Sequence, residues 1–257
     1  EKEILRSTQN DKERPDNTPK PPFSKKLITI ISAVAICIIA VLFGIKSCDD
    51  RKAAEAEAQR TKAIAEQQRL AKEEAEYART HGKINGHEYV DLGLSVKWAT
   101  CNVGASTPEG YGDYYAWGET KEKDDYYWSN YKWYNCSDGT MTKYCRVDYK
   151  TVLDPNDDVA HVKWGGSWRM PTKAEQDELR AKCTWSDITQ NGVKGCKVTG
   201  PNGNSIFLPA VSSGGYWSIS LCDIDFDGIR LVCFLGYNGS DGWGSRCSGR
   251  AVRPVSE

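Results

Sequence analysis

One short loop has the residue types of a metal site. Residues 154–158 read Asp-Pro-Asn-Asp-Asp, so four oxygen-bearing side chains stand within five positions. Carboxylate and amide oxygens are the hard donors that Ca²⁺ prefers, and the candidate ligands are Asp154, Asn156, Asp157 and Asp158. The same residues also favour an ordinary turn, in which Asx side chains bond the nearby backbone. We expect the turn, with a calcium site as the alternative and no other cofactor.

Candidate catalytic groups are sparse. Beyond residue 82 the chain has two histidines, His87 and His161, and neither lies in a Ser/His or Cys/His motif. The sequence contains no phosphate-binding loop and no Cys-x-x-Cys pair. We therefore expect no enzymatic activity. The formal net charge of −1 also argues against a nucleic-acid partner.

The stretch 222–248 has the features of a binding surface. Strand alternation around Val232 and Phe234 points these two side chains inward and places Leu231, Cys233 and Leu235 on the outer side, an unusual apolar row for a free surface. Its 27 residues include no Lys, Glu, Gln or Met. We expect this stretch to contact a ligand. The candidate contacts are Asp223, Ile224, Asp225, Phe226, Asp227, Leu235, Tyr237, Asn238, Ser240, Asp241, Trp243 and Ser245.

The cysteines allow disulfides without requiring them. Eight of the ten lie beyond residue 100, an even number that suggests pairing outside the cytoplasm. The pairs to test first are Cys136 with Cys145 and Cys183 with Cys196. The alternative is that the thiols are free and buried, where they act as small hydrophobic groups.

The elements that must position these residues fall into four segments. Residues 1–26 are polar and Pro-rich, which predicts a disordered tail. Residues 27–45 are uncharged and apolar, and as a helix they would be about 28 Å long, which predicts a transmembrane helix. Residues 46–81 are mostly strong helix formers and predict a charged helical stalk. Residues 82–257 contain all nine tryptophans and predict the folded domain.

The apolar segment predicts the location of the domain. A short tail before it and a large domain after it favour a single-pass protein with the C-terminal domain outside the cytoplasm. An alternative is a lipoprotein anchored at Cys48, because the residues before this cysteine loosely resemble a lipobox. Both interpretations place residues 82–257 outside the cytoplasm.

The stalk could also mediate oligomerisation. Ala56, Ala63, Leu70 and Tyr77 recur every seven positions, as in a weak coiled-coil seam. The second heptad position is mostly charged or polar, so we favour a single solvated helix with pairs such as Glu66 and Arg69.

Within residues 82–257, short apolar runs between turn residues predict strands. The runs are residues 89–92, 96–99, 114–117, 205–208, 215–218 and 231–234. One helix is well marked, because Thr172 and Glu175 form a capping box and the helical pattern continues to about Cys183. Few helices and many short strands predict a loop-rich α+β fold.

Several longer motifs carry a family resemblance. They are residues 85–94, 98–105, 111–120, 164–172, 216–218 and 249–255. Together they resemble the Fibrobacter succinogenes-type major paralogous domain of Bacteroidota surface proteins, which is similar in fold to C-type lectins and formylglycine-generating enzymes. The resemblance covers about residues 84–255. It implies an α+β, C-type-lectin-like fold outside the cytoplasm, and it implies no known reaction.

The resemblance gives residues 222–248 a second interpretation. Some C-type-lectin-like proteins are variable proteins whose Asn codons are randomised at adenines by diversity-generating retroelements. Apart from one Trp, this stretch contains only residues that codons ending in C or T can encode. Ordinary loop composition is the alternative. The lectin sugar motifs Glu-Pro-Asn and Trp-Asn-Asp are absent from the sequence.

Together these features predict a membrane-anchored surface-display protein. It would bind a protein or glycan ligand outside the cytoplasm through residues 222–248. The alternative is a structural envelope protein that docks constitutively to a neighbouring surface component. Residues 164–172 and 250–255 are expected to form the scaffold, with the Arg253 guanidinium tying loops together.

Overall fold

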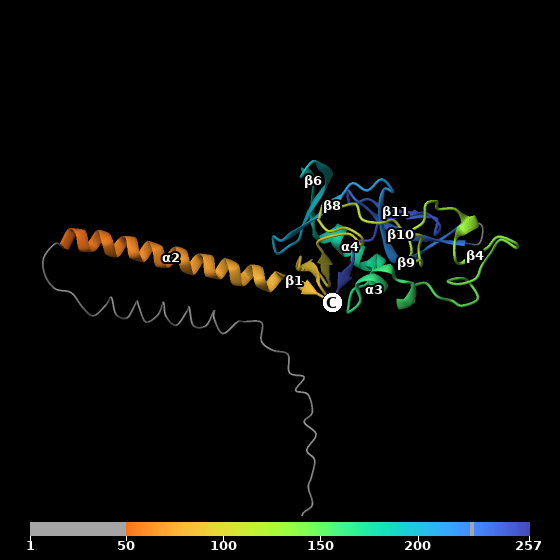
Figure 1. The fold of residues 1–257 in the computed structure, drawn as a ribbon, viewed down its shortest axis with the longest axis horizontal. Coiled ribbons are helices and arrows are strands. Elements are labelled where there is room, and N and C mark those ends of the chain that lie inside the picture. Colours follow the sequence, from red (N-terminus) through yellow and green to blue (C-terminus); the bar gives the residue numbers. More distant parts are fainter. Residues whose placement is uncertain (1–49, 227–228) are drawn as a thin grey trace, which may run out of the picture. The chain divides into compact units, whose positions relative to one another are not determined.

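The computed structural model describes residues 50–226 and 229–257. The chain divides into two units, residues 1–71 and 72–257. The described residues contain three α-helices, α2 (Asp50–Thr80), α3 (Val159–Trp164) and α4 (Lys173–Lys182), and two short 3₁₀ helices, η1 (Trp128–Asn130) and η2 (Pro155–Asp157) (Figure 1). Strands and turns account for most of the remaining described residues.

These observations correct the predicted architecture. An α+β fold with one transmembrane helix in front was expected, but from residue 72 onward the described chain is mostly β-structure with two short α-helices. Across residues 50–226 and 229–257, no helix is long and apolar enough to cross a membrane. The expected single-pass location is therefore not supported. The segment 27–45 and Cys48 themselves lie outside the described residues.

Helix α2 has the sequence features of a solvated helix. Glu66 and Arg69 form the expected ion pair, with 2.6 Å between Oε1 and Nη2. All four positions of the proposed seam, Ala56, Ala63, Leu70 and Tyr77, are exposed in the single chain. The coiled-coil interpretation is not supported.

The first sheet joins the two ends of the second unit. Its strand order is β1 (His81–Ile84), β2 (His87–Val90), β3 (Lys97–Ala99) and β12 (Val255–Ser256), with every neighbouring pair antiparallel. Asn85 and Gly86 connect β1 to β2 with positive φ values of 47° and 86°. Such φ values at both central residues are typical of the type I′ turn that suits a two-residue hairpin.

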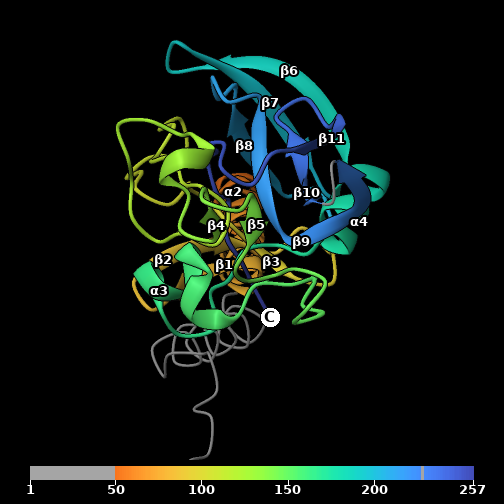
Figure 2. The ribbon, with the colours of Figure 1, turned by 90° about the vertical axis from the view of Figure 1, so that its right-hand side faces the viewer.

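Three further sheets complete the unit (Figure 2). Strands β6 (Thr184–Gln190), β7 (Val193–Thr199) and β8 (Ser205–Pro209) form an antiparallel sheet. Strands β9 (Gly215–Phe226), β10 (Ile229–Gly236) and β11 (Asp241–Gly244) form another, in the order β11-β10-β9. The smallest pairs β4 (Tyr134–Asn135) with β5 (Thr140–Met141). The expected strand at 114–117 is reduced to an isolated bridge between Tyr115 and Arg250.

Helix α4 begins where its capping box predicts. Thr172 is the N-cap, and its side chain accepts a hydrogen bond from the Glu175 amide. The Glu175 carboxylate in turn accepts from the Thr172 amide at 2.7 Å. Two of the orphan amides at a helix start are thereby satisfied, and the prediction of this helix is confirmed.

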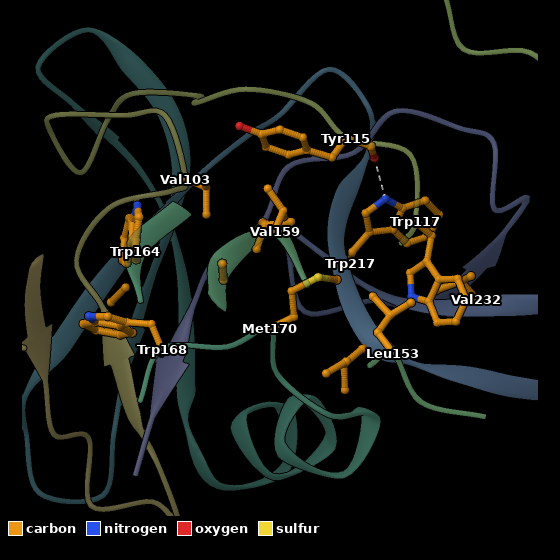
Figure 3. Close-up of a cluster of buried hydrophobic side chains, with 14 of the residues drawn as sticks. Val103, Tyr115, Trp117, Leu153, Val159, Trp164, Trp168, Met170, Trp217 and Val232 are labelled. Atoms are coloured by element: carbon orange, nitrogen blue, oxygen red, sulfur yellow. Dashed lines mark hydrogen bonds between the residues drawn. The ribbon is translucent and has the colours of Figure 1, made fainter. Parts of the chain in front are cut away.

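The main core is built around indole rings whose polar atoms are satisfied. Trp117, Trp168 and Trp217 are fully buried in one hydrophobic cluster (Figure 3). Trp217 Nε1 donates to the Tyr115 carbonyl at 2.8 Å, the bond drawn in Figure 3. Trp168 Nε1 donates to the Ile84 carbonyl at 2.8 Å. Because a buried indole N–H needs a partner, each of these rings also ties one segment of the chain to another.

Arg253 has the structural role expected of it. Its buried guanidinium donates to Asn102 Oδ1 at 2.7 Å, to the Ala99 carbonyl at 3.1 Å and to the Phe207 carbonyl at 3.0 Å. A further bond reaches the Thr100 carbonyl at 2.5 Å. These contacts join the loop after β3 to strand β8, so the predicted tie between loops is confirmed.

The disulfide arrangement differs from both expected pairs. Cys222 of β9 is bonded to Cys233 of β10. Cys136, Cys145, Cys183 and Cys196 are free thiols. The first pairs to test were therefore the wrong ones, and the bond instead links two neighbouring strands.

Candidate functional site

The apolar row that was expected to face outward is buried. Val232 and Phe234 do face the main core, as the strand alternation predicts. Leu231, Cys233 and Leu235 lie on the opposite side of β10 but are also buried. Helix α4 contacts both β9 and β10 (Figure 2). Leu235 is only 1% exposed and shares a cluster with Leu179 of α4. The prediction that this row, Leu235 included, forms a contact face is therefore wrong.

The remaining candidate residues divide between two ends of the β9-β10-β11 sheet. At the β10–β11 turn, Asn238, Ser240 and Asp241 are exposed, and Trp243 is 57% exposed. Ser245 follows this turn and is half-buried. At the opposite end, Asp223, Ile224 and Asp225 are exposed near the tip of the β9–β10 hairpin. Asp227 and the Phe226 side chain lie outside the described residues.

The β10–β11 turn is anchored to α4. The Asp241 carboxylate lies 3.3 Å from Lys173 Nζ and 3.5 Å from Arg180 Nη1. Arg180 Nε also donates to the Gly239 carbonyl at 3.0 Å. Tyr237 borders a separate hollow of about 420 Å³, together with strands β6 and β7. The charges of this end are thus already paired within the protein.

The hairpin end, by contrast, borders a cavity of about 550 Å³. One wall consists of Asp223, Asp225 and Arg230 from the β9–β10 hairpin. The other wall is the segment 141–151, and Arg246 completes the lining. Cavities of several hundred Å³ are the usual size of small-ligand sites. Two of the predicted contact residues, Asp223 and Asp225, therefore line this cavity.

The opposing wall is held in shape by one carboxylate. Asp148 accepts hydrogen bonds from the amides of Tyr144 (2.6 Å), Cys145 (2.8 Å) and Lys150 (3.1 Å). Burial alone would raise the pKa of Asp148, but these amide donors hold that pKa below its ordinary value. Tyr144 and Tyr149 adopt φ values of 58° and 55° in the left-handed region. Such backbone is unfavourable for bulky residues and is concentrated at functional sites.

Arg246 lies at the border of the cavity as a buried cation. Arg246 is only 1% exposed. Nε donates to the Arg230 carbonyl at 2.8 Å and Nη1 to the Tyr144 carbonyl at 2.7 Å. Its guanidinium also lies 5.5 Å from the centre of the Trp117 ring. Burial lowers the pKa of Arg246, but a guanidinium remains protonated in proteins. The Asp148 carboxylate attracts this cation electrostatically, but no carboxylate of the described residues forms an ion pair with it.

Charges at the cavity mouth are partly paired. Arg146 Nη2 lies 3.0 Å from Asp225 Oδ2. Lys150 Nζ lies 2.6 Å from Asp154 Oδ2, outside the lining. Asp223 and Arg230 have no side-chain partner within the part of the chain that the structure describes. The cavity therefore presents one free carboxylate and two cations that form no ion pair with a described residue.

The three carboxylates of residues 154–158 are engaged by the protein. Asp157 accepts from Lys132 (3.1 Å), Lys143 (2.5 Å) and Tyr144 (2.7 Å). Burial alone would raise the pKa of Asp157, but these donors keep it below its ordinary value. Asp154 is paired with two lysines.

Asp158 is occupied in a different way, as the N-cap of α3. It accepts from the amides of Ala160 and His161, and its other oxygen accepts from Met170. Asn156 is exposed within η2. Nowhere in residues 50–226 and 229–257 do three or more His, Cys, Asp or Glu residues come together as a metal site. The calcium alternative at Asp154, Asn156, Asp157 and Asp158 is therefore not supported.

Sequence reasoning missed Arg246 and the 141–151 wall. Arg246 carries no motif, and its burial depends on segments far from it in the chain. The two left-handed tyrosines also give no sequence signal, because turns of this kind are usually marked by Gly or Asn.

Comparison with known proteins adds no relative. No protein-family model, curated protein or solved structure matches this chain. The resemblance to the Fibrobacter succinogenes-type major paralogous domain and to C-type lectins accordingly stays a prediction from the motifs.

Proposed function

We propose that residues 72–257 form a ligand-recognition module that binds its ligand in the cavity between segment 141–151 and the β9–β10 hairpin. The observation that carries this proposal is the cavity of about 550 Å³ whose walls include Asp223 and Asp225. Both residues belong to the stretch that the sequence singles out for binding. The volume suits a small ligand or the terminal unit of a glycan or peptide.

Recognition is favoured over catalysis by the cavity lining. Among its described lining residues there is no histidine, whereas four cations, two carboxylates and exposed aromatic area are present. Such groups orient a ligand by charge and hydrogen bonds. That the chain is not an enzyme stays a prediction.

A glycan and peptide array probed with the full chain tests the proposal. Asp223→Ala should abolish or strongly reduce the signal, because it removes the free carboxylate of the cavity mouth. The matched control is Trp243→Ala, which changes an exposed residue at the other end of the same sheet and should leave the signal unchanged. The reverse result would place the ligand at β11, as expected for docking to a neighbouring component, and would overturn the proposal.

Retroelement diversification of residues 222–248 stays a separate prediction. If it occurs, varied residues at positions 223 and 225 would change one cavity wall, while segment 141–151 would stay constant. The genomic test is a near-copy of the DNA that encodes 216–253, next to a reverse transcriptase gene, with mismatches confined to adenines. Mismatches at other bases would argue against it.

A further inference from the structure

The unpaired cation beside the cavity indicates the ligand's charge. A guanidinium has five N–H donors, and the described residues occupy two donors of Arg246, both with neutral carbonyls. Burying a charge without a counterion is costly. Elsewhere in this unit the partly buried Arg169 forms an ion pair with a carboxylate, with 2.6 Å between its Nη2 and Glu175 Oε1. Arg253 is also buried with neutral acceptors alone, but Arg246 lines a cavity, where a ligand could supply an anion to its remaining donors.

The cavity mouth restricts what kind of anion would fit. Arg230 adds a second cation without an anionic partner, but Asp223 on the same wall would repel a simple anion. A ligand that combines a carboxylate with hydroxyl groups avoids this conflict. Its carboxylate would pair with the arginines, and its hydroxyls would donate to Asp223, because an ionised carboxylate is only an acceptor.

The aromatic part of the lining fits the same ligand. Tyr149 is 86% exposed and borders the cavity, so its ring offers a free apolar face. Met141 adds further apolar area to this wall. A sugar ring has an apolar C–H face beside its hydroxyls and can lie on such a surface, as amphipathic groups do on tyrosine.

On these grounds we infer that the cavity binds a uronic acid, a sugar that carries a carboxylate, with Arg246 and Arg230 receiving the carboxylate and Asp223 receiving the hydroxyls. This inference rests on the proposed function, since it names the ligand class of that same cavity. A terminal uronic acid of a longer glycan would bind in the same way, with the rest of the glycan outside the mouth.

Titration of the full chain with matched sugars tests the inference. The probes are D-glucuronate and D-galacturonate, each beside its neutral counterpart, D-glucose or D-galactose, followed by calorimetry or by ligand-observed NMR. Each acid should bind at least about tenfold more tightly than its neutral partner, as a charge-assisted bond worth about 1.4 kcal/mol requires. Acetate and a tripeptide with a free C-terminus should bind weakly, because neither offers sugar hydroxyls.

Two variants assign the effect to the arginines. Arg230→Gln changes an exposed side chain and should weaken binding of the acids about three- to tenfold while leaving the neutral sugars unchanged. Arg246→Lys should weaken it more. If Arg246→Lys fails to fold, Arg230→Gln still decides. Lys197→Gln, on strand β7 and outside the cavity lining, is the matched control and should have no effect.

The outcomes separate this inference from the function on which it rests. If both acids bind no better than their neutral sugars, the uronic-acid assignment fails, while an array ligand lost in Asp223→Ala would keep the cavity as the binding site. If the tripeptide or acetate binds as tightly as the acids, the site recognises a carboxylate alone and the sugar assignment fails. If no array ligand depends on Asp223, both proposals fall.

Discussion

Replacing Asp148 tests whether one carboxylate shapes the cavity wall. Its Oδ1 accepts from Cys145 and Lys150, and its Oδ2 accepts from Tyr144. In Asp148→Asn the amide oxygen can keep the first two bonds, but the amide nitrogen then faces the Tyr144 N–H. The substitution therefore removes the charge-assisted bond from the Tyr144 amide and places two N–H donors against each other. The volume of the side chain hardly changes.

The expected loss of folding free energy follows from the lost bond between the Tyr144 amide and Asp148. Hydrogen bonds to charged groups contribute about 1.5–3 kcal/mol, and because Asp148 is half-exposed we take the lower part of this range, about 1.5–2 kcal/mol. In a unit of this size about 1 kcal/mol corresponds to roughly 2–4 °C in Tm, so Tm should fall by about 3–8 °C. Asp148→Ala loses all three bonds and should fall further.

The pH dependence provides a second check with a definite sign. The pKa of Asp148 is lowered in the folded protein from its ordinary value of 3.8. Its contribution to the stability of the fold is therefore fully present above about pH 4. It is lost as the pH falls through the folded value, because protonation removes the charge. The Tm difference between wild type and Asp148→Asn should thus be constant from pH 5 to 7 and shrink below pH 4.

Asp138→Asn is the matched control for this experiment. Asp138 lies in a neighbouring turn, and its Oδ1 accepts from both the Thr140 amide and the Thr140 hydroxyl. Asparagine can keep both Thr140 bonds. The remaining partner of Asp138 is the Asn135 side-chain amide, 2.9 Å from Oδ2, and in this exposed turn that amide can turn to water, so Tm should change by less than about 1 °C. Scanning calorimetry or a thermal melt by circular dichroism measures both variants. A Tm for Asp148→Asn within 1 °C of wild type at pH 7 would refute the reasoning.

Three further predictions concern the scaffold. Arg253→Met removes the donor of four hydrogen bonds, three of them buried, and should cost about 4 kcal/mol or more in urea unfolding. Arg253→Lys should recover part of this loss, and a cost below about 1 kcal/mol for Arg253→Met would contradict its structural role. Adding 1 mM CaCl₂ or EDTA should not shift Tm, since the carboxylates of residues 154–158 are engaged by the protein, and a rise of several degrees with calcium would reverse this conclusion. Removing the Cys222–Cys233 bond should cost about 2–3 kcal/mol by loop-closure entropy, and peptide mapping without reductant should recover these two cysteines linked; recovery of other pairs would disprove the arrangement.

Local signals in the sequence were sufficient for some elements. The capping box of Thr172 and Glu175 predicts α4 because both partners lie within one helical turn, and the helix begins there. Helix α2 follows in the same way from a long run of strong helix formers. In both cases the interactions that decide the structure are close in sequence, so no knowledge of the fold is needed.

The burial of β10 shows where such reasoning stops. Alternation with a period of two separates Val232 from Cys233 correctly, but it does not say what covers the second face. At Leu235 that face packs against α4, which ends some fifty residues earlier in the chain. An apolar row on the second face thus has two explanations, a contact surface or a packed helix, and only tertiary structure distinguishes them.

The three arginines near the C-terminus illustrate the same limit for the site. Arg253 uses its donors on acceptors of the surrounding loops, whereas Arg250 lies on the Phe234 ring, 3.6 Å from its centre. Arg246 instead bonds two carbonyls and borders a cavity. All three lie within eight positions in a loop-rich segment, so residue type and spacing predict one role for all of them. Arg246 differs from the other two because it faces the cavity wall of residues 141–151. That wall is shaped by the left-handed backbone of Tyr144 and by the turn at Asp148, about a hundred residues earlier in the sequence. A ligand site that depends on such a pairing of distant segments can be found only once the fold is known.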